Sequence, residues 1–73
     1  FIFDNATLES IMQTLKNWYG IEVYFEQESL KNLHFTGNMD RYGTISPILQ
    51  AIAQTTNLQV AIKERKITIS SFN

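Results

Sequence analysis

The stretch TLESIMQTLKNWYGIEVYF at residues 7–25 decides the fold, because its pattern returns as TISPILQAIAQTTNLQVAI at residues 44–62. The offset is 37 residues, and over the 19 aligned positions four residues are identical and five apolar residues exchange for other apolar residues. Each copy has the pattern of a helix cap, an amphipathic helix, a turn and a strand. Two copies are too few for a solenoid, so the repeat predicts one duplicated unit folded on itself.

In the first copy, apolar residues recur at spacings of three and four and form one helical face: Leu8, Ile11, Met12, Leu15, Trp18 and Tyr19. Thr7 is the expected N-cap of this helix, and Gly20 is its expected left-handed C-cap. Residues 21–26 then alternate between apolar and polar, which is typical of a half-buried strand. A short strand at residues 1–3, broken by the turn-forming residues 4–6, is predicted to precede the helix.

The second copy predicts another helix, with Thr44 as its cap. Pro47 fits the first turn, where a missing N–H costs little. No charged residue occurs at residues 45–56. A helix with so little charge around its circumference is usually buried on more than one side, so we expect it to be the central helix.

Between the two copies, a connector leads to a predicted strand at residues 34–39, with Leu30 as its expected anchor in the core and Leu33 as a second candidate anchor. Phe35 and Met39 share one face of this strand, with Gly37 between them. A glycine inside a strand indicates a bulge or the close approach of another backbone. A turn at residues 40–43 is expected to follow.

After the second helix, Asn57 takes the left-handed position that Gly20 has in the first copy. Residues 58–62 and 67–69 alternate as two strands, and the short link Glu64-Arg65 between them predicts a hairpin. The expected fold class is therefore α+β, with duplicated β-α-β units in the order βαβ-βαββ and two helices packed with small mixed sheets. We expect residues 1–73 to form a single domain.

Composition excludes several functions. Six basic and seven acidic residues give a net charge of -1, which lacks the electrostatic footprint of a nucleic-acid binder. The chain has no cysteine, so disulfides, thiol nucleophiles and thiolate metal sites are absent. No apolar run approaches the roughly 20 residues that span a membrane.

The residues that could carry chemistry do not form a motif. His34 is the only histidine and has no partner that the sequence places beside it, so we interpret it as structural. Glu22 and Glu26 lie on one strand face about 13 Å apart, which is too far for paired acid-base work. Trp18 and Tyr19 are interpreted as core or core rim. We predict no catalytic, cofactor-binding or metal-binding residue and no enzyme, and the partner-binding residues stay unassigned.

Short strands in two units leave sheet edges without a neighbour. An exposed edge can pair with another chain, so the sequence favours a role in protein interaction.

Several segments together resemble the C-terminal domain of FecR-like anti-sigma factors: residues 1–8, 11–12, 18–23, 35–39, 48–49 and 67–69. The resemblance covers nearly the whole chain, and the Phe-Thr-Gly strand at residues 35–37 is its most telling part. Proteins of this family have a cytoplasmic segment that holds an ECF-type sigma factor, one membrane helix, and a periplasmic region that ends in this domain.

The resemblance thus implies a periplasmic domain of an inner-membrane protein in a Gram-negative bacterium, cut here from the C-terminal end of a longer membrane-anchored chain. The implied partners are the N-terminal signalling domain of a TonB-dependent transducer and, through the upstream part, the sigma factor. It implies no cofactor, no nucleic acid and no membrane contact by the domain itself. The related fold is the short secretin and TonB N-terminal domain, and the alternative is that the chain is such a domain of a secretin or TonB-dependent receptor.

Overall fold

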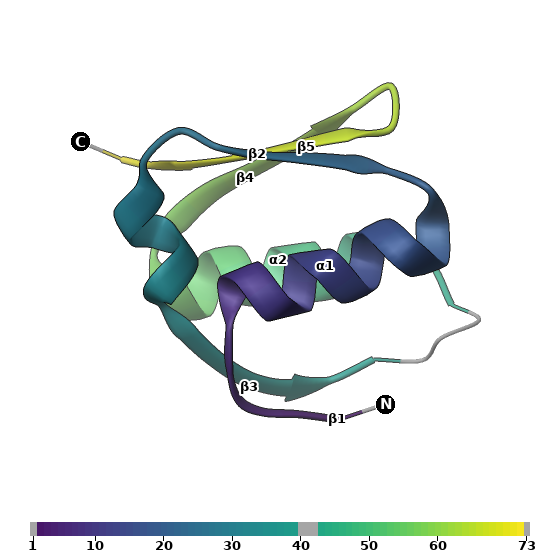
Figure 1. The fold of residues 1–73 in the computed structure, drawn as a ribbon. Coiled ribbons are helices and arrows are strands. Elements are labelled where there is room, and N and C mark those ends of the chain that lie inside the picture. The colour runs from purple at the N-terminus through teal and green to yellow at the C-terminus, as the bar shows by residue number, and fades with distance from the viewer. Residues whose placement is uncertain (1, 40–42, 73) are drawn as a thin grey trace.

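Two helices lie side by side in a middle layer, with a small sheet above and another below them (Figure 1). The computed structural model describes residues 2–39 and 43–72. Its elements follow in the order β1 (Ile2–Thr7), α1 (Leu8–Tyr19), β2 (Glu22–Phe25), the short helix η1 (Glu28–Asn32), β3 (His34–Asn38), α2 (Ser46–Thr56), β4 (Leu58–Lys63) and β5 (Lys66–Ser71). This confirms the α+β class and the order βαβ-βαββ.

Helix α1 begins and ends where the sequence predicts. The N–H of Ser10 donates to Oγ1 of Thr7 at 3.3 Å, and Thr7 has extended backbone angles, as an N-cap requires. Gly20 has φ 60 and donates its N–H to the carbonyl of Lys16 at 2.9 Å, which closes the helix with a left-handed cap. The predicted apolar face supplies four fully buried side chains: Leu8, Ile11, Met12 and Leu15.

Helix α2 begins differently from the prediction, because Thr44 does not cap it. The N-cap position is Ile45, which has helical angles and no side chain that could accept a hydrogen bond. Pro47 lies in the first turn, where its fixed φ and missing N–H suit a helix start without a polar cap. At the other end, Asn57 has φ 58 and forms the left-handed cap that the sequence predicts.

The expectation that α2 is the central helix is wrong. Only three of its side chains are buried, namely Ile48, Leu49 and Ile52, whereas α1 buries four. Its solvent side carries exposed but uncharged residues, such as Gln50 and Gln54. The missing charge therefore reflects an uncharged polar surface, not burial on several sides, and the two helices share the middle layer.

Strands β1 and β3 pair antiparallel, and β1 is longer than predicted. Its register shifts between Phe3 and Ala6, where Asn5 has φ 52 and donates its N–H to Oγ1 of Thr36 at 2.9 Å. The turn-forming residues are thus absorbed as an irregularity within the strand. Phe1 of the predicted first strand and residues 40–42 of the turn predicted at residues 40–43 lie outside the described residues.

Gly37 borders the irregularity, because it pairs with Phe3 where the register shifts. It also has a packing role that the sequence did not predict. A Cβ at Gly37 would lie 2.7 Å from two ring atoms of Phe35, which is buried in the core. The missing side chain makes room for this ring.

Strands β2, β5 and β4 form the second sheet in that order, with β5 in the centre. β2 runs parallel to β5, and β4 runs antiparallel to it. The predicted hairpin is present: Glu64 and Arg65 link β4 to β5 with φ 51 and 68, as a two-residue turn of type I′ requires. Each helix thereby connects two strands that belong to different sheets.

One apolar core lies between the layers. Ile67 and Ile69 of the central strand β5 are fully buried. Leu30 anchors η1 as predicted, whereas Leu33, the second candidate anchor, is 37% exposed. Within residues 2–39 and 43–72 no polar or charged side chain is buried. None of the helices described is long and apolar enough to cross a membrane.

Candidate interaction surface

The side chains that the sequence singled out for chemistry do not come together. His34 is exposed at the start of β3, opposite Thr7 of β1. Glu22 is exposed at the start of β2, and Glu26 is exposed just beyond its end. Their backbone N–H groups donate to the carbonyls of Arg65 and Ile69 at 2.8 and 2.9 Å. In the part of the chain that the structure describes, no group of His, Asp or Glu side chains could hold a metal ion.

Trp18 and Tyr19 lie at the rim of the core, as interpreted from the sequence. Both are half-buried and pack against the core cluster. The Tyr19 hydroxyl donates to the carbonyl of Gly43 at 3.1 Å, which ties the end of α1 to the segment before α2. These contacts are structural.

The duplication creates two equivalent grooves, each between the helix and the strand of one copy. The first, between α1 and β2, is lined by Glu9, Met12, Gln13, Lys16, Val23, Phe25 and Lys31. The second, between α2 and β4, is lined by Ser46, Leu49, Gln50, Ala53, Val60 and Ile62. When 37 is added to the numbers of the first six residues that line the first groove, the result is the complete set of residues that line the second groove. The two grooves differ in charge and in what lies over them.

Lys31 of η1 lies over the first groove. Its Nζ is 2.8 Å from Oε2 of Glu28 and 3.9 Å from Oε2 of Glu9. The same Nζ lies 5.9 Å from the centre of the Phe25 ring. The hydrogen-bonded Glu28 carboxylate raises the pKa of Lys31 above its ordinary value, against the opposing effect of burial, and the Glu9 charge adds to the rise. A protonated lysine thus joins α1, β2 and η1 across this groove.

The second groove carries no charged side chain in its lining. Ser46 takes the place of Glu9, and Ala53 takes the place of Lys16. After Lys63 the chain turns back into the hairpin, so among the described residues the second lining has no counterpart of Lys31. Ile62 remains 43% exposed, and the groove has a volume of about 200 Å³, compared with about 140 Å³ for the first.

The second groove runs along an edge strand. The described strands leave four edges, and two of them are blunted in ways that natural sheets use. β1 has the register shift and the charged Asp4, and β2 has Glu22 with Glu26 just beyond it. The one apolar side chain of β3, Phe35, is buried in the core.

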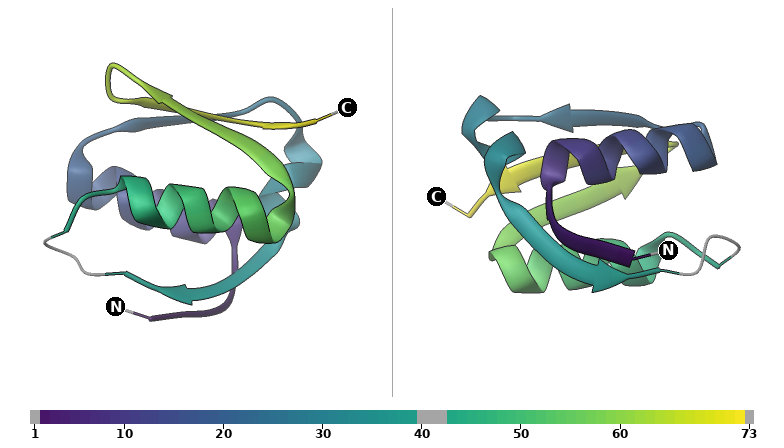
Figure 2. Two further views of the ribbon diagram at one scale, coloured as in Figure 1. Left: turned by 180° about the vertical axis from the view of Figure 1, so that it is seen from behind. Right: turned by 60° about the horizontal axis from the view of Figure 1, so that its bottom comes forward.

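Strand β4 has none of these protections along most of its length. Its six residues pair with β5 without a break in register, and the only charge on the strand is Lys63 at its end. Seen from behind the view of Figure 1, α2 and β4 lie together on one face of the molecule (Figure 2, left). An unbroken, almost uncharged edge beside an open apolar groove is the most suitable place for another chain to dock.

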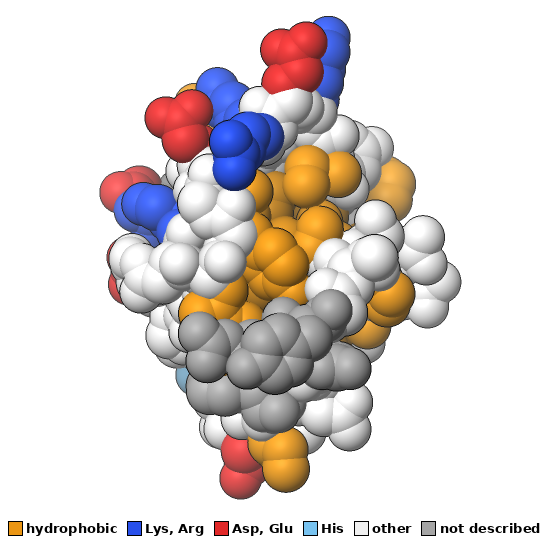
Figure 3. All heavy atoms as spheres, turned by 90° about the vertical axis from the view of Figure 1, so that its right-hand side faces the viewer, with side chains coloured by type: hydrophobic (Ala, Val, Ile, Leu, Met, Phe, Trp, Pro, Cys, Tyr) orange, Lys and Arg blue, Asp and Glu red, His pale blue; other side chains and the backbone are white. Residues whose placement is uncertain are grey.

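At the hairpin end of the molecule, charged and hydrophobic side chains occupy different parts of the surface. In Figure 3 most of the charged side chains lie toward the top and the left, one acidic side chain lies at the bottom, and hydrophobic atoms are exposed in the middle. The hairpin contributes three basic residues and one acidic residue at residues 63–66. Charge thus borders the apolar surface at this end.

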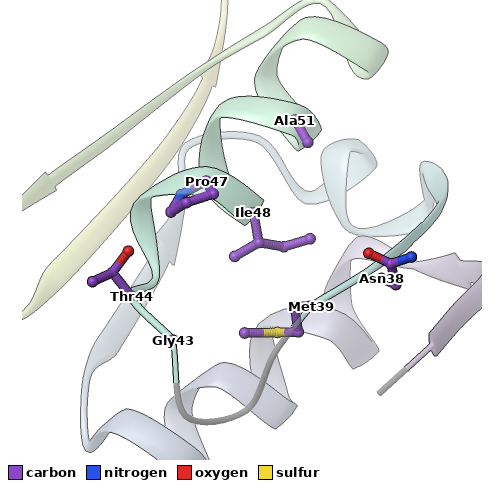
Figure 4. Close-up of a pocket in the computed structure, with 7 residues that line it drawn as sticks. All are labelled: Asn38, Met39, Gly43, Thr44, Pro47, Ile48 and Ala51. Atoms are coloured by element: carbon purple, nitrogen blue, oxygen red, sulfur yellow. The ribbon is translucent and has the colours of Figure 1, made fainter.

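A second uncharged hollow lies between β3 and the start of α2. It has a volume of about 290 Å³, and Met39 and Ile48 point into it from opposite sides (Figure 4). Asn38, Pro47 and Ala51 also contribute to its lining. Because its lining includes Met39 and Gly43, between which the chain is not described, we assign it no role.

The sequence contained a signal for the groove pair that periodicity alone did not reveal. Aligning the repeat and comparing charges shows Glu9 and Lys16 replaced by Ser46 and Ala53. That difference marks one copy as charged and the other as uncharged on equivalent surfaces. The position of Lys31 over the first groove could not be found in this way, because it depends on where η1 packs.

Comparison with known proteins agrees with the fold. The family model described as FecR, C-terminal, matches residues 1–69. No curated protein sequence matches the chain significantly. Two crystal structures of a proposed anti-sigma factor from Parabacteroides distasonis each resemble the chain with a TM-score of 0.83 and 18% sequence identity.

The structural likeness covers 100% of this chain but only 34% of the solved one, so the chain spans about a third of the length of that protein. At 18% identity it shows the fold alone. The family match is broader evidence, since it leaves only the last four residues of the 73 outside. The chain belongs to the FecR C-terminal family.

Proposed function

We propose that this domain is the periplasmic interaction module of a FecR-like anti-sigma regulator. It binds the N-terminal signalling domain of a TonB-dependent outer-membrane transducer and passes the signal to an ECF-type sigma factor held by an upstream part of the protein. The observation that carries the proposal is the family match over residues 1–69. The family is regulatory, and the domain acts by binding, without catalysis.

The open groove between α2 and β4 supports this proposal, because it supplies an apolar surface and unpaired strand edge on the same face. In the proposed cell context the upstream part carries the membrane anchor, and the domain faces the periplasm. The alternative, a domain of a secretin or TonB-dependent receptor, rests on the related fold alone.

The experiment that tests the proposal is a calorimetric titration of the domain with the signalling domain of its transducer. We expect saturable one-to-one binding. Absence of heat and of any spectral change at high micromolar concentration would refute the proposed partner.

A matched pair of variants locates the surface. Ile62→Lys places a charge at the second groove, and we expect it to weaken binding about tenfold or more, as at a central interface residue. Ile2→Lys makes the same exchange on β1, where the side chain is 76% exposed, and should leave the affinity unchanged. Equal effects of the two substitutions would contradict the assignment of the surface.

A further inference from the structure

We infer that the partner docks by adding an extended segment as a further strand beside β4, with alternate apolar side chains of that segment entering the groove against α2. The segment is uncharged along the groove and carries an acidic residue where it passes Lys63. This inference rests on the proposed function for the existence of a partner, and it concerns how the partner is recognised.

The backbone of β4 is a regular strand with one edge to which a further strand can be added. On one side it pairs with β5 from Leu58 to Lys63 without a bulge, and on the other side it is the edge of the sheet. When a strand is added to an edge, main-chain hydrogen bonds supply affinity and pockets for alternate side chains supply specificity. The groove provides these pockets, because side chains of an added strand point to the helix layer at every second position.

The first groove indicates the chemistry of the occupant. Over that groove the Nζ of Lys31 has two carboxylates near it, that of Glu28 at 2.8 Å and that of Glu9 on α1 at 3.9 Å. The lining of the second groove, which has Ser46 and Ala53 at the equivalent positions, contains no carboxylate. A basic side chain of the partner would find no opposite charge there, and moving an unpaired charge out of water costs free energy. An apolar side chain instead gains contact with the exposed part of Ile62.

At the hairpin end of the groove, a charged residue of the partner is favoured. Lys63 closes β4, and Arg65 and Lys66 follow around the hairpin with Glu64 as the only acidic residue. Lys66 lies over the ring of Tyr24 on β2, at the opposite edge of the sheet, so Lys63 is the positive charge that stands on β4 itself. This charge favours an acidic residue in a segment that runs past this point. The complete recognition pattern is therefore alternating apolar residues followed or preceded by an acid, depending on strand direction.

The chain itself allows a test without any transducer. Ser71 pairs with Leu58, so the end of β5 lies beside the start of β4. A Gly-Ser linker of about eight residues, fused to the C-terminus, therefore lets a probe strand run along β4 at an effective concentration in the millimolar range. The probe is Thr-Val-Thr-Val-Thr-Val-Glu, which brings its Glu to Lys63, and the control probe has Lys in place of each Val.

Hydrogen exchange of the β4 amides is the readout. We expect the Val probe to slow their exchange about tenfold or more relative to the Lys probe, because edge amides become paired. The variant Ser46→Glu/Ala53→Lys, which copies the charges of the first groove, should remove the difference between the probes. Equal exchange with both probes, or a full difference in the variant, would overturn the inference.

Sedimentation of the domain without a fused probe tests whether a second copy of the domain occupies the edge of β4. A dimer that protects the same β4 amides would mean that a second copy covers the edge, and it would overturn the inference as well. None of these measurements contains the transducer, so their failure leaves the proposed function untouched. Conversely, strand addition without transducer binding would refute only the proposed function.

Discussion

Gly37→Ala is the substitution that tests the packing of the β1–β3 sheet most sharply, because two physical effects predict opposite signs. In a strand with free space, replacing glycine by alanine stabilises a protein by about 0.4–1 kcal/mol through the unfolded chain. Here the new Cβ would lie 2.7 Å from atoms Cε2 and Cζ of Phe35, well inside contact distance. Phe35 is held in the core and cannot move freely.

We expect the clash to dominate. Overpacking a well-packed core costs about 1–3 kcal/mol, so Gly37→Ala should lower the free energy of unfolding by about that amount. For a domain of this size each kcal/mol corresponds to about 4–8 °C in melting temperature. Urea denaturation followed by circular dichroism measures the change, and the slope of the transition should stay constant.

A double-mutant cycle attributes the loss to its cause. Phe35→Leu removes the ring, so Gly37→Ala in that background should cost at least about 1 kcal/mol less than in the parent. A neutral or stabilising effect of Gly37→Ala in the parent chain would refute the account of this glycine. A cost that persists unchanged beside Phe35→Leu would show that the strain lies in the backbone.

Four further variants test the ends and the middle of the elements. Thr7→Ala should cost about 0.5–2 kcal/mol, because it removes a cap, whereas Thr44→Ala should change stability by less than about 0.5 kcal/mol; thermal melts of both separate the observed cap from the predicted one. Glu64→Asn with Arg65→Gly should stabilise the domain by about 1 kcal/mol, since both native residues have positive φ; an unchanged or lower melting temperature would contradict the turn geometry. Ile52→Ala should cost about 2–5 kcal/mol in urea denaturation, because its side chain is fully buried, and a loss below about 1 kcal/mol would place α2 outside the core.

Local patterns predicted the elements well because the physics that forms them is local. The apolar spacing of α1, its cap at Thr7 and its end at Gly20 all depend on residues within one or two turns. The same holds for the hairpin at Glu64 and Arg65. The error at Thr44 arose from copying a cap across the repeat, although Pro47 offers the second helix a different start.

Non-local arrangement was harder to predict. The sequence could not show that β1 pairs with β3 while β2 pairs with β5, since these pairings join distant segments. The uncharged surface of α2 was mistaken for burial, because Gln50 and Gln54 are polar without charge. The offset of the repeat predicts two equivalent surfaces, but only packing shows that Lys31 lies over one of them and leaves the other open.

The most direct test of the docking surface is an NMR titration of the labelled domain with the unlabelled signalling domain of the transducer. We predict that the largest amide shift changes occur in β4 and along the groove side of α2, with few changes in β2 or in the β1–β3 sheet. Shift changes centred on the groove that holds Lys31, with β4 unaffected, would contradict the account.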